Sequence, residues 1–133
     1  MIDLESDIFD AVAKAIESAH AGVTCGSTYN PSPAKLPFVS IVEADNRVNE
    51  QMRTTNIENA VIVMYECNIY TNKPSNRKAE AKAIAATMDA KFAEIGFTRT
   101  LKSETPNFND VSIYRLTCRY EAVIDKDFWI YSN

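Results

Sequence analysis

The side chains that most often carry out chemistry in proteins are few in this chain. It has one histidine, His20, and three cysteines, Cys25, Cys67 and Cys118, which are far apart in sequence. A zinc site needs His and Cys ligands at short spacings, and nucleophilic catalysis needs a nucleophile beside a base; neither pattern can be written here. We therefore interpret His20 as a helix-end residue and the cysteines as buried thiols of a reducing cytosol.

Two pairs of carboxylates lie two residues apart, Glu43 with Asp45 and Asp125 with Asp127. On a strand this spacing puts both groups on one face, but acid–base catalysis also needs burial that separates their pKa values. Both pairs border turns, where we expect them to be solvated. Carboxylates from distant segments could still converge on a magnesium or hydrolytic site, which a sequence does not reveal.

Phosphate-binding glycine loops are also missing from the sequence. With three glycines, neither GxGxxG nor GxxxxGK[ST] can be formed. Taken with the scarcity of His and Cys, this predicts no catalytic residue, no bound metal and no organic cofactor, and hence a protein that is not an enzyme.

Length and composition are those of an ordinary globular protein. The 133 residues are 46% apolar and 24% charged, which favours a single domain over residues 1–133. A formal net charge of −4 argues against a module that binds duplex nucleic acid, because such modules carry a basic face. The first ten residues lack the layout of a signal peptide, and no apolar run approaches the roughly 18 residues that span a bilayer. We expect a cytoplasmic protein that does not enter a membrane.

The elements of the first half can be read from periodicity. Apolar residues recur every three to four positions from about Asp3 to His20, which predicts an amphipathic helix with Asp3 as N-cap. Short strands are expected at 23–29 and 38–44, separated by a proline-rich link. A polar loop should follow from Asp45 to Asn59, and loops of this length are usually functional or mobile.

The second half is more strongly patterned. We expect a long strand at 60–71, a helix over about 75–95 with Ser75 as N-cap, and a stop at Gly96 in the left-handed conformation. A short strand at 97–101, a turn at 107–110 and a long alternating strand ending near Asp125 come next. The final FWIYS segment reads as a last short strand.

These elements predict an α+β fold with the order α-β-β-β-α-β-β and a strand-like tail. Each helix carries one apolar stripe, and the last long strand alternates along its length as half-buried antiparallel strands do. The expected architecture is therefore a single, mostly antiparallel sheet with both helices packed on one face.

Several exposed segments are candidate interaction surfaces. Basic residues gather at the start of the second helix, where the helix dipole disfavours them, which indicates a partner surface or an acidic neighbour. The polar loop has two arginines that could pair with a partner's carboxylates, and the final segment is bulky on both faces. The candidate interface residues are Arg47, Asn49, Gln51, Arg53, Lys73, Arg77, Lys78, Phe128, Trp129 and Tyr131.

The arrangement of segments resembles a known family. The chain has a helix before a proline-rich link, FVSIVEADN before the polar loop and a long strand ending YTNKP. An alanine-rich helix ending GFTRT and the run NFNDVSIYRLTCRYEAVID follow. In order and length, over nearly the whole chain, this pattern resembles the phage tail terminator (tail completion) proteins of tailed phages and prophages.

The resemblance implies a structural virion protein in the tail or neck, assembled in the host bacterial cytoplasm. Such a protein forms a homo-oligomeric ring, typically of six subunits, that caps the head-proximal end of the tail tube and stops tube polymerisation. Its implied partners are the tail tube protein, the sheath where the tail is contractile, and the neck or head-completion protein. DNA would pass through the channel without specific binding, since an acidic ring repels it.

Two other interpretations remain open from the sequence. One is a different neck or head–tail joining component of the same kind of particle. The other is a cytosolic ligand-binding or enzymatic α+β domain with a pocket between its sheet and its helices.

Overall fold

The computed structural model describes residues 1–30, 33–50, 59–107 and 110–132. Within these ranges the chain forms two helices and six strands. Their bounds are α1 (Glu5–Ala19), β1 (Thr24–Gly26), β2 (Phe38–Val48), β3 (Ala60–Thr71), α2 (Arg77–Ile95), β4 (Thr98–Glu104), β5 (Tyr114–Asp125) and β6 (Ile130–Ser132).

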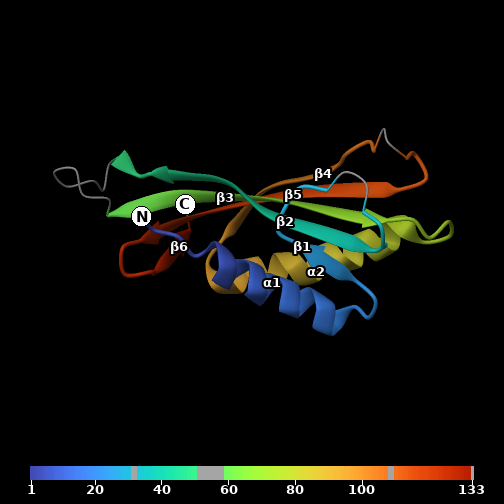
Figure 1. Cartoon of the computed structure of the whole chain (residues 1–133), viewed down its shortest axis with the longest axis horizontal. Coiled ribbons are helices and arrows are strands. Elements are labelled where there is room, and N and C mark those ends of the chain that lie inside the picture. The colour runs from blue at the N-terminus through green and yellow to red at the C-terminus, as the bar shows by residue number, and fades with distance from the viewer. Residues whose placement is uncertain (31–32, 51–58, 108–109, 133) are drawn as a thin grey trace.

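The six strands form one sheet, in the order β1-β2-β3-β5-β4, with β6 also paired to β5. The short β1 runs parallel to β2, and every other pairing is antiparallel. Thr98 of β4 pairs with Glu121, and Ser132 of β6 pairs with the next residue, Ala122, so that β4 and β6 share one edge of β5. Both helices lie below the sheet and contact each other (Figure 1). The predicted α+β class, element order and one-sided helix layer are confirmed.

The core lies between the helices and one face of the sheet. Helix α1 buries Ile8, Val12 and Ile16 there, and α2 buries Ile84, Met88 and Phe92. From the sheet, Tyr65 of β3 and Tyr120 of β5 extend into the same layer. Phe92 stacks on Tyr120 at 4.1 Å between ring centroids and meets Phe97 edge-on at 5.3 Å. Alternation along β3 and β5 produces this layer, because successive side chains point to opposite faces.

Helix ends differ from the sequence-based expectation. The N-cap of α2 is Asn76 rather than Ser75, and that of α1 is Leu4 rather than Asp3; neither cap residue makes a side-chain capping bond. Asp3 Oδ1 still accepts a hydrogen bond from the Glu5 N–H at 3.0 Å, although Asp3 lies one residue before the N-cap position. The predicted stop of α2 is confirmed, because Gly96 is left-handed with φ +119° and its N–H bonds to the carbonyls of Phe92 and Ala93.

Strand β2 is longer than predicted. The expected loop from Asp45 is wrong for residues 45–48, which pair with β3, and the Asn49 N–H continues the ladder to the Ala60 carbonyl at 2.9 Å. The register shifts between Glu43 and Asp45, so that Glu43 pairs with Tyr65 and Asp45 with Met64. Because Tyr65 and Met64 point to opposite faces, the two carboxylates do not share a face as the i, i+2 spacing suggested.

Gly96 ends α2 and also permits the close approach of β6. A Cβ at Gly96 would lie 3.0 Å from the Ile130 carbonyl oxygen, whereas one at Gly22, also at positive φ, would meet nothing within 4 Å. We expect Gly22→Ala to lower the free energy of unfolding by about 1–2 kcal/mol through left-handed strain alone. Gly96→Ala should cost at least about 1 kcal/mol more, because the Ile130 backbone must also move. Equal losses in urea denaturation would contradict this role.

Candidate assembly surfaces

The turn between β5 and β6 is organised by one carboxylate. Asp125 Oδ1 accepts hydrogen bonds from the N–H groups of Asp127 at 2.9 Å and Trp129 at 3.0 Å, and its Oδ2 accepts one from the Tyr131 hydroxyl at 3.0 Å. The Asp125 N–H donates to the Trp129 carbonyl, and the Phe128 N–H donates to the Asp125 carbonyl. We call residues 125–131 the aromatic hairpin; its backbone and one of its aromatic side chains are held by Asp125.

The aromatic hairpin presents large apolar side chains to solvent. Phe128 is 55% exposed, Trp129 67% and Tyr131 49%. Phe128 has φ +65°, a conformation that bulky residues rarely adopt. Exposed aromatics on a fixed turn are typical of a binding surface, because little side-chain entropy is lost on contact. The structure thus brings together the three aromatic residues that the sequence marked as interface candidates.

Asp125 makes the hairpin sensitive to acid. Partial desolvation raises the pKa of Asp125, but hydrogen bonds from Trp129, Tyr131 and Asp127 outweigh it and lower the pKa below the usual value. The stability that the Asp125 carboxylate gives the hairpin is therefore fully present above its unfolded-state pKa of about 3.9. It is lost as the pH falls through the lower pKa that Asp125 has in the folded chain.

We expect Asp125→Ala to open the hairpin at neutral pH, with faster amide hydrogen exchange at Asp127 and Trp129. Asp127→Ala is the matched control, since it removes the same charge but keeps the backbone donor. Trp129 is the one tryptophan of the chain, so its fluorescence reports on the hairpin directly. Unchanged exchange in Asp125→Ala would show that the carboxylate does not hold the turn.

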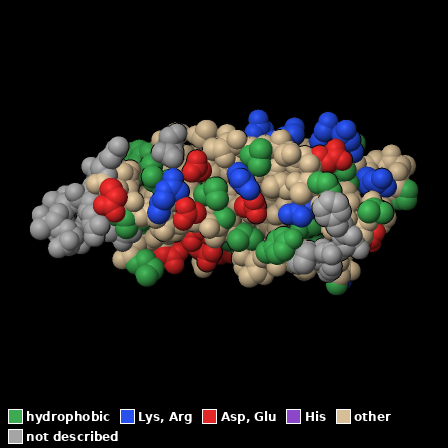
Figure 2. All heavy atoms as spheres, turned by 90° about the horizontal axis from the view of Figure 1, so that it is seen from above, with side chains coloured by type: hydrophobic (Ala, Val, Ile, Leu, Met, Phe, Trp, Pro, Cys, Tyr) green, Lys and Arg blue, Asp and Glu red, His purple; other side chains and the backbone are tan. Residues whose placement is uncertain are grey.

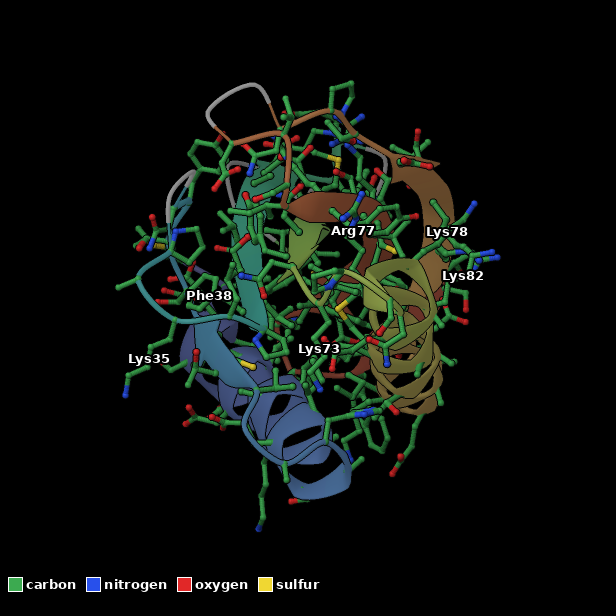
Figure 3. All side chains as sticks on the ribbon, turned by 90° about the vertical axis from the view of Figure 1, so that its right-hand side faces the viewer. Lys35, Phe38, Lys73, Arg77, Lys78 and Lys82 are labelled. Carbon is green, nitrogen blue, oxygen red and sulfur yellow. The ribbon has the colours of Figure 1, made fainter. Side chains whose placement is uncertain are left out.

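A basic surface covers the opposite end of the molecule, where α2 begins. Arg77, Lys78 and Lys82 project from the first turns of α2, and Lys73 precedes them (Figure 3). Lys73 Nζ lies 3.2 Å from Glu80 Oε2, which is the acidic neighbour considered in the sequence analysis. We call Lys73, Arg77, Lys78 and Lys82 the basic end.

A groove lies beside the basic end. It has a volume of about 470 Å³ and is formed between the start of α2, the end of β4 and the start of β5. Val111 on its wall is 87% exposed, while Asn107 is 7% exposed and its side-chain nitrogen has no hydrogen-bond partner among the described residues. The groove therefore offers apolar surface and a buried polar donor. Its lining includes Arg77, Asn107, Val111, Ile113, Tyr114 and Arg115.

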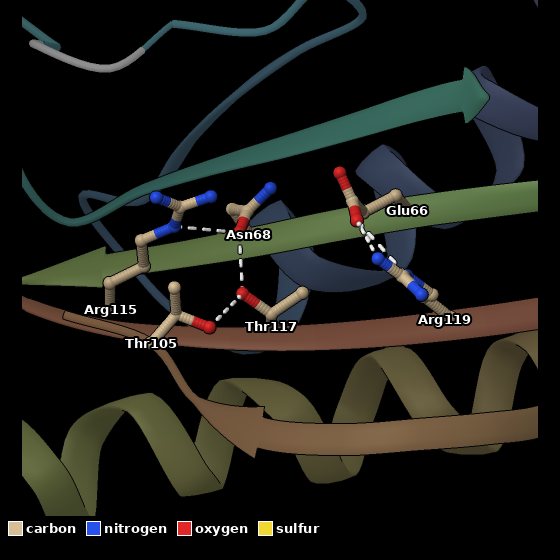
Figure 4. Close-up of polar contacts among 6 residues, drawn as sticks. All are labelled: Glu66, Asn68, Thr105, Arg115, Thr117 and Arg119. Atoms are coloured by element: carbon tan, nitrogen blue, oxygen red, sulfur yellow. Dashed lines mark hydrogen bonds and ion pairs between the residues drawn. The ribbon is translucent and has the colours of Figure 1, made fainter. Parts of the chain in front are cut away.

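One face of the sheet packs on the helices; we call the opposite face the helix-free face. A polar network on the helix-free face fixes one wall of this groove (Figure 4). Asn68 Oδ1 accepts from Arg115 Nε at 2.9 Å and from the Thr117 hydroxyl at 2.7 Å. Because the Thr117 proton is used in this way, the Thr105 hydroxyl donates to Thr117 at 2.8 Å. The Arg115 guanidinium also lies 5.8 Å from the ring centroids of Tyr29 and Tyr70. Its position is thus set by a hydrogen bond and by two aromatic faces.

The rest of the helix-free face carries interspersed charges. Basic and acidic side chains alternate along it, and Lys and Arg gather toward the end at the right of the view (Figure 2). Arg119 contacts Glu66 at 3.0 Å, and Arg47 contacts Asp45 at 2.7 Å and Glu121 at 3.8 Å. Arg47 thus already pairs with two carboxylates of its own chain while half exposed, and its pairing with a partner's carboxylate stays a prediction. Each such pair is exposed and contributes little to stability.

The other candidate residues of the predicted loop are only partly placed. Asn49 lies at the end of the β2 ladder. Gln51 and Arg53 lie outside the described residues. Sequence reasoning missed Asn68 and the organising role of Asp125, because a polar residue within a strand and an acid in a turn are common and carry no distinct signal.

The described residues bring no metal-binding group together. Among them, no three His, Cys, Asp or Glu side chains are placed to hold an ion. His20 Nε2 lies 2.8 Å from Thr87 Oγ1, which joins α1 to α2. The three cysteines are free; burial, with Glu17 nearby, raises the pKa of Cys25 to about 12. Over the same residues, neither helix has the length and apolar character needed to cross a bilayer.

Comparison with known proteins gives matches to solved structures. No protein-family model and no curated protein sequence matches the chain. Among solved structures, the chain is similar to one from a "Virion of native gene transfer agent (GTA) particle", with a TM-score of 0.61 and 15% sequence identity. The similarity covers 92% of this chain and 94% of the other. The two chains share a fold over essentially their full lengths.

Proposed function

We propose that this chain is a structural virion protein that forms a ring, of six subunits, on the head-proximal end of a phage tail tube. The ring stops tube polymerisation and provides the surface to which the neck or head docks. The observation that carries the proposal is the full-length fold shared with a chain of a gene transfer agent virion. The ordered resemblance of the sequence to tail terminator proteins is the support for the proposed position within the particle.

The surfaces of the chain support an assembly role. Two ends of the molecule are built for contact: the aromatic hairpin, fixed by Asp125, and the basic end with its groove. In the described residues the polar side chains of the helix-free face are engaged with one another rather than arranged around a reacting centre. A subunit of a fixed assembly needs pre-organised contact surfaces and no reactive site on them.

The proposed partners follow from the position in the particle. Subunits contact one another, the tail tube protein on one side and the neck or head-completion protein on the other, and the sheath as well in a contractile tail. DNA passes through the channel without specific contacts. We assign the aromatic hairpin and the basic end to these interfaces, together with Arg47, Asn49, Gln51 and Arg53, the candidates that the sequence offers between β2 and β3.

The proposal is tested by assembling tails with and without the chain. Tail tube protein should polymerise to uncontrolled lengths when the chain is omitted, and adding the purified chain should restore tubes of defined length. Restored length without binding to tube ends would contradict a cap. Tubes of normal length that fail to join heads when the chain is omitted would identify a joining component instead.

A further inference from the structure

We propose that the aromatic hairpin of one copy docks in the groove at the basic end of the next copy, and that this head-to-tail contact closes the ring. The inference rests on the proposed function, since it specifies how the subunits of that ring meet. It names a second copy of this chain as the occupant of the groove.

The two surfaces lie at opposite ends of the molecule (Figure 1). Strand β5 starts in the groove, at Tyr114 and Arg115, and ends at Asp125, the organiser of the hairpin. Twelve residues of extended chain separate the two ends by about 40 Å. The hairpin therefore cannot reach the groove of its own chain, and any contact between them joins two copies.

A contact between two different patches is heterologous. Each copy then uses its hairpin on one neighbour and its groove on the other, and the chain of contacts closes into a ring or continues as a filament. A hairpin-to-hairpin contact would instead stop at a dimer. Of these two arrangements, only the head-to-tail one is compatible with the proposed ring.

The hairpin offers protruding aromatic side chains, and the groove offers a hollow with apolar walls. The hairpin presents the exposed side chains of Phe128 and Trp129 from a hydrogen-bonded turn, and aromatic side chains are enriched at protein interfaces. The groove, at about 470 Å³, has room for more than one aromatic ring. Val111, Ile113 and Tyr114 supply apolar contact, and the buried Asn107 amide supplies a donor for a main-chain or hydroxyl oxygen of the entering hairpin.

The charges of the two ends are opposite. The hairpin carries Asp125, Lys126 and Asp127, and the N-terminus, whose first residues include Asp3 and Glu5, lies at the same end of the molecule (Figure 1). The groove carries Arg77 and Arg115 against one carboxylate, Glu104, and Lys78 and Lys82 follow Arg77 in α2. Complementary charge of this kind orients two surfaces as they meet and disfavours the contact of like ends.

Site-specific cross-linking tests the contact. A cysteine is placed in the hairpin (Lys126→Cys) and another on the groove wall (Val111→Cys), and purified protein is treated with a short bismaleimide. The double variant should give a ladder of linked chains, and an equimolar mixture of the two single variants should give dimers only. Each single variant alone should give no more than wild type, whose native thiols are protonated and react slowly.

The controls separate this inference from the proposed function. Lys14→Cys, on the exposed side of α1, replaces Val111→Cys in a matched double variant and should give no ladder. Dimers from Lys126→Cys alone, or no ladder from the hairpin–groove pair, would overturn the inference. Native mass spectrometry of wild type reports the ring itself, so that rings without the cross-link would refute this contact and leave the proposed function standing.

Charge reversal provides a second readout. Arg77→Glu and Asp127→Lys should each lower the cross-linking yield of the double-cysteine protein by about two- to fivefold, the effect of losing one exposed ion pair. Combining both reversals should restore the yield, because the pair is re-formed with opposite polarity. Additive losses in the combined variant would show that these two ends do not meet.

Discussion

Phe92→Ala is expected to lower the free energy of unfolding by about 3–5 kcal/mol, the range for truncating a fully buried aromatic residue. Phe92 has no exposed surface, stacks on Tyr120 at 4.1 Å and touches Tyr65 and Phe97 through tilted and edge-on contacts. Its removal leaves a cavity at the point where α2, β3 and β5 meet. Urea denaturation followed by far-UV circular dichroism measures the loss.

Phe128→Ala is the matched control for Phe92→Ala. It makes the same chemical change at a side chain that is 55% exposed, and we expect a change within about 0.5 kcal/mol. If both variants lost similar stability, the hairpin would be part of the core and its aromatics could not be reserved for a partner. A large loss of stability at Phe92 with none at Phe128 would show that Phe92 is needed for folding and that Phe128 is available for assembly.

Asn68→Leu is expected to lower the free energy of unfolding by about 2–3 kcal/mol, although leucine has a similar size. Asn68 is 1% exposed and its oxygen accepts hydrogen bonds from Arg115 and Thr117. Replacing it leaves the charged Arg115 donor without its acceptor and forces the Thr117 hydroxyl to reorient toward Thr105, and the unpaired donor costs more than its bond contributes. Chemical denaturation gives the magnitude, and heteronuclear NMR of the Arg115 side chain reports its release.

Thr105→Val is the comparison for the same network. Its hydroxyl donates to Thr117 at the end of the chain of bonds, so its removal leaves no charged group without a partner. We expect a loss of about 0.5–1.5 kcal/mol in the free energy of unfolding. If Thr105→Val cost as much as Asn68→Leu, the network would not be centred on Asn68. The position of Arg115 on the groove wall would then depend on its contacts with Tyr29 and Tyr70.

The sequence predicted helices and strands best where a periodic pattern of apolar residues continued over many residues. The stripe from Ile8 to Ile16 and the alternation from Tyr114 to Ile124 predicted α1 and β5, because such spacings bury one face in only one kind of element. The extent of β2 could not be predicted, since Asp45, Asn46 and Arg47 have low strand propensity. Pairing with the apolar start of β3 outweighs that propensity, and the shift after Glu43 leaves no sequence signal.

The candidate surfaces were predicted in composition but not in arrangement. Phe128, Trp129 and Tyr131 stand out as bulky residues near the end of the chain, yet nothing in the sequence says that Asp125 ties them into one turn. The groove depends on residues from α2, β4 and β5 that are distant along the chain. Contacts of this kind are set by tertiary packing, which local patterns do not encode.

The central claim, that the chain caps a tail tube as a ring, is tested most directly by cryo-electron microscopy of tubes mixed with the purified protein. We predict a single ring of six copies on one end of each tube, with the aromatic hairpin of every copy seated in the groove of its neighbour. A protein that stays monomeric beside uncapped tubes, or that binds only along the tube wall, would contradict the account.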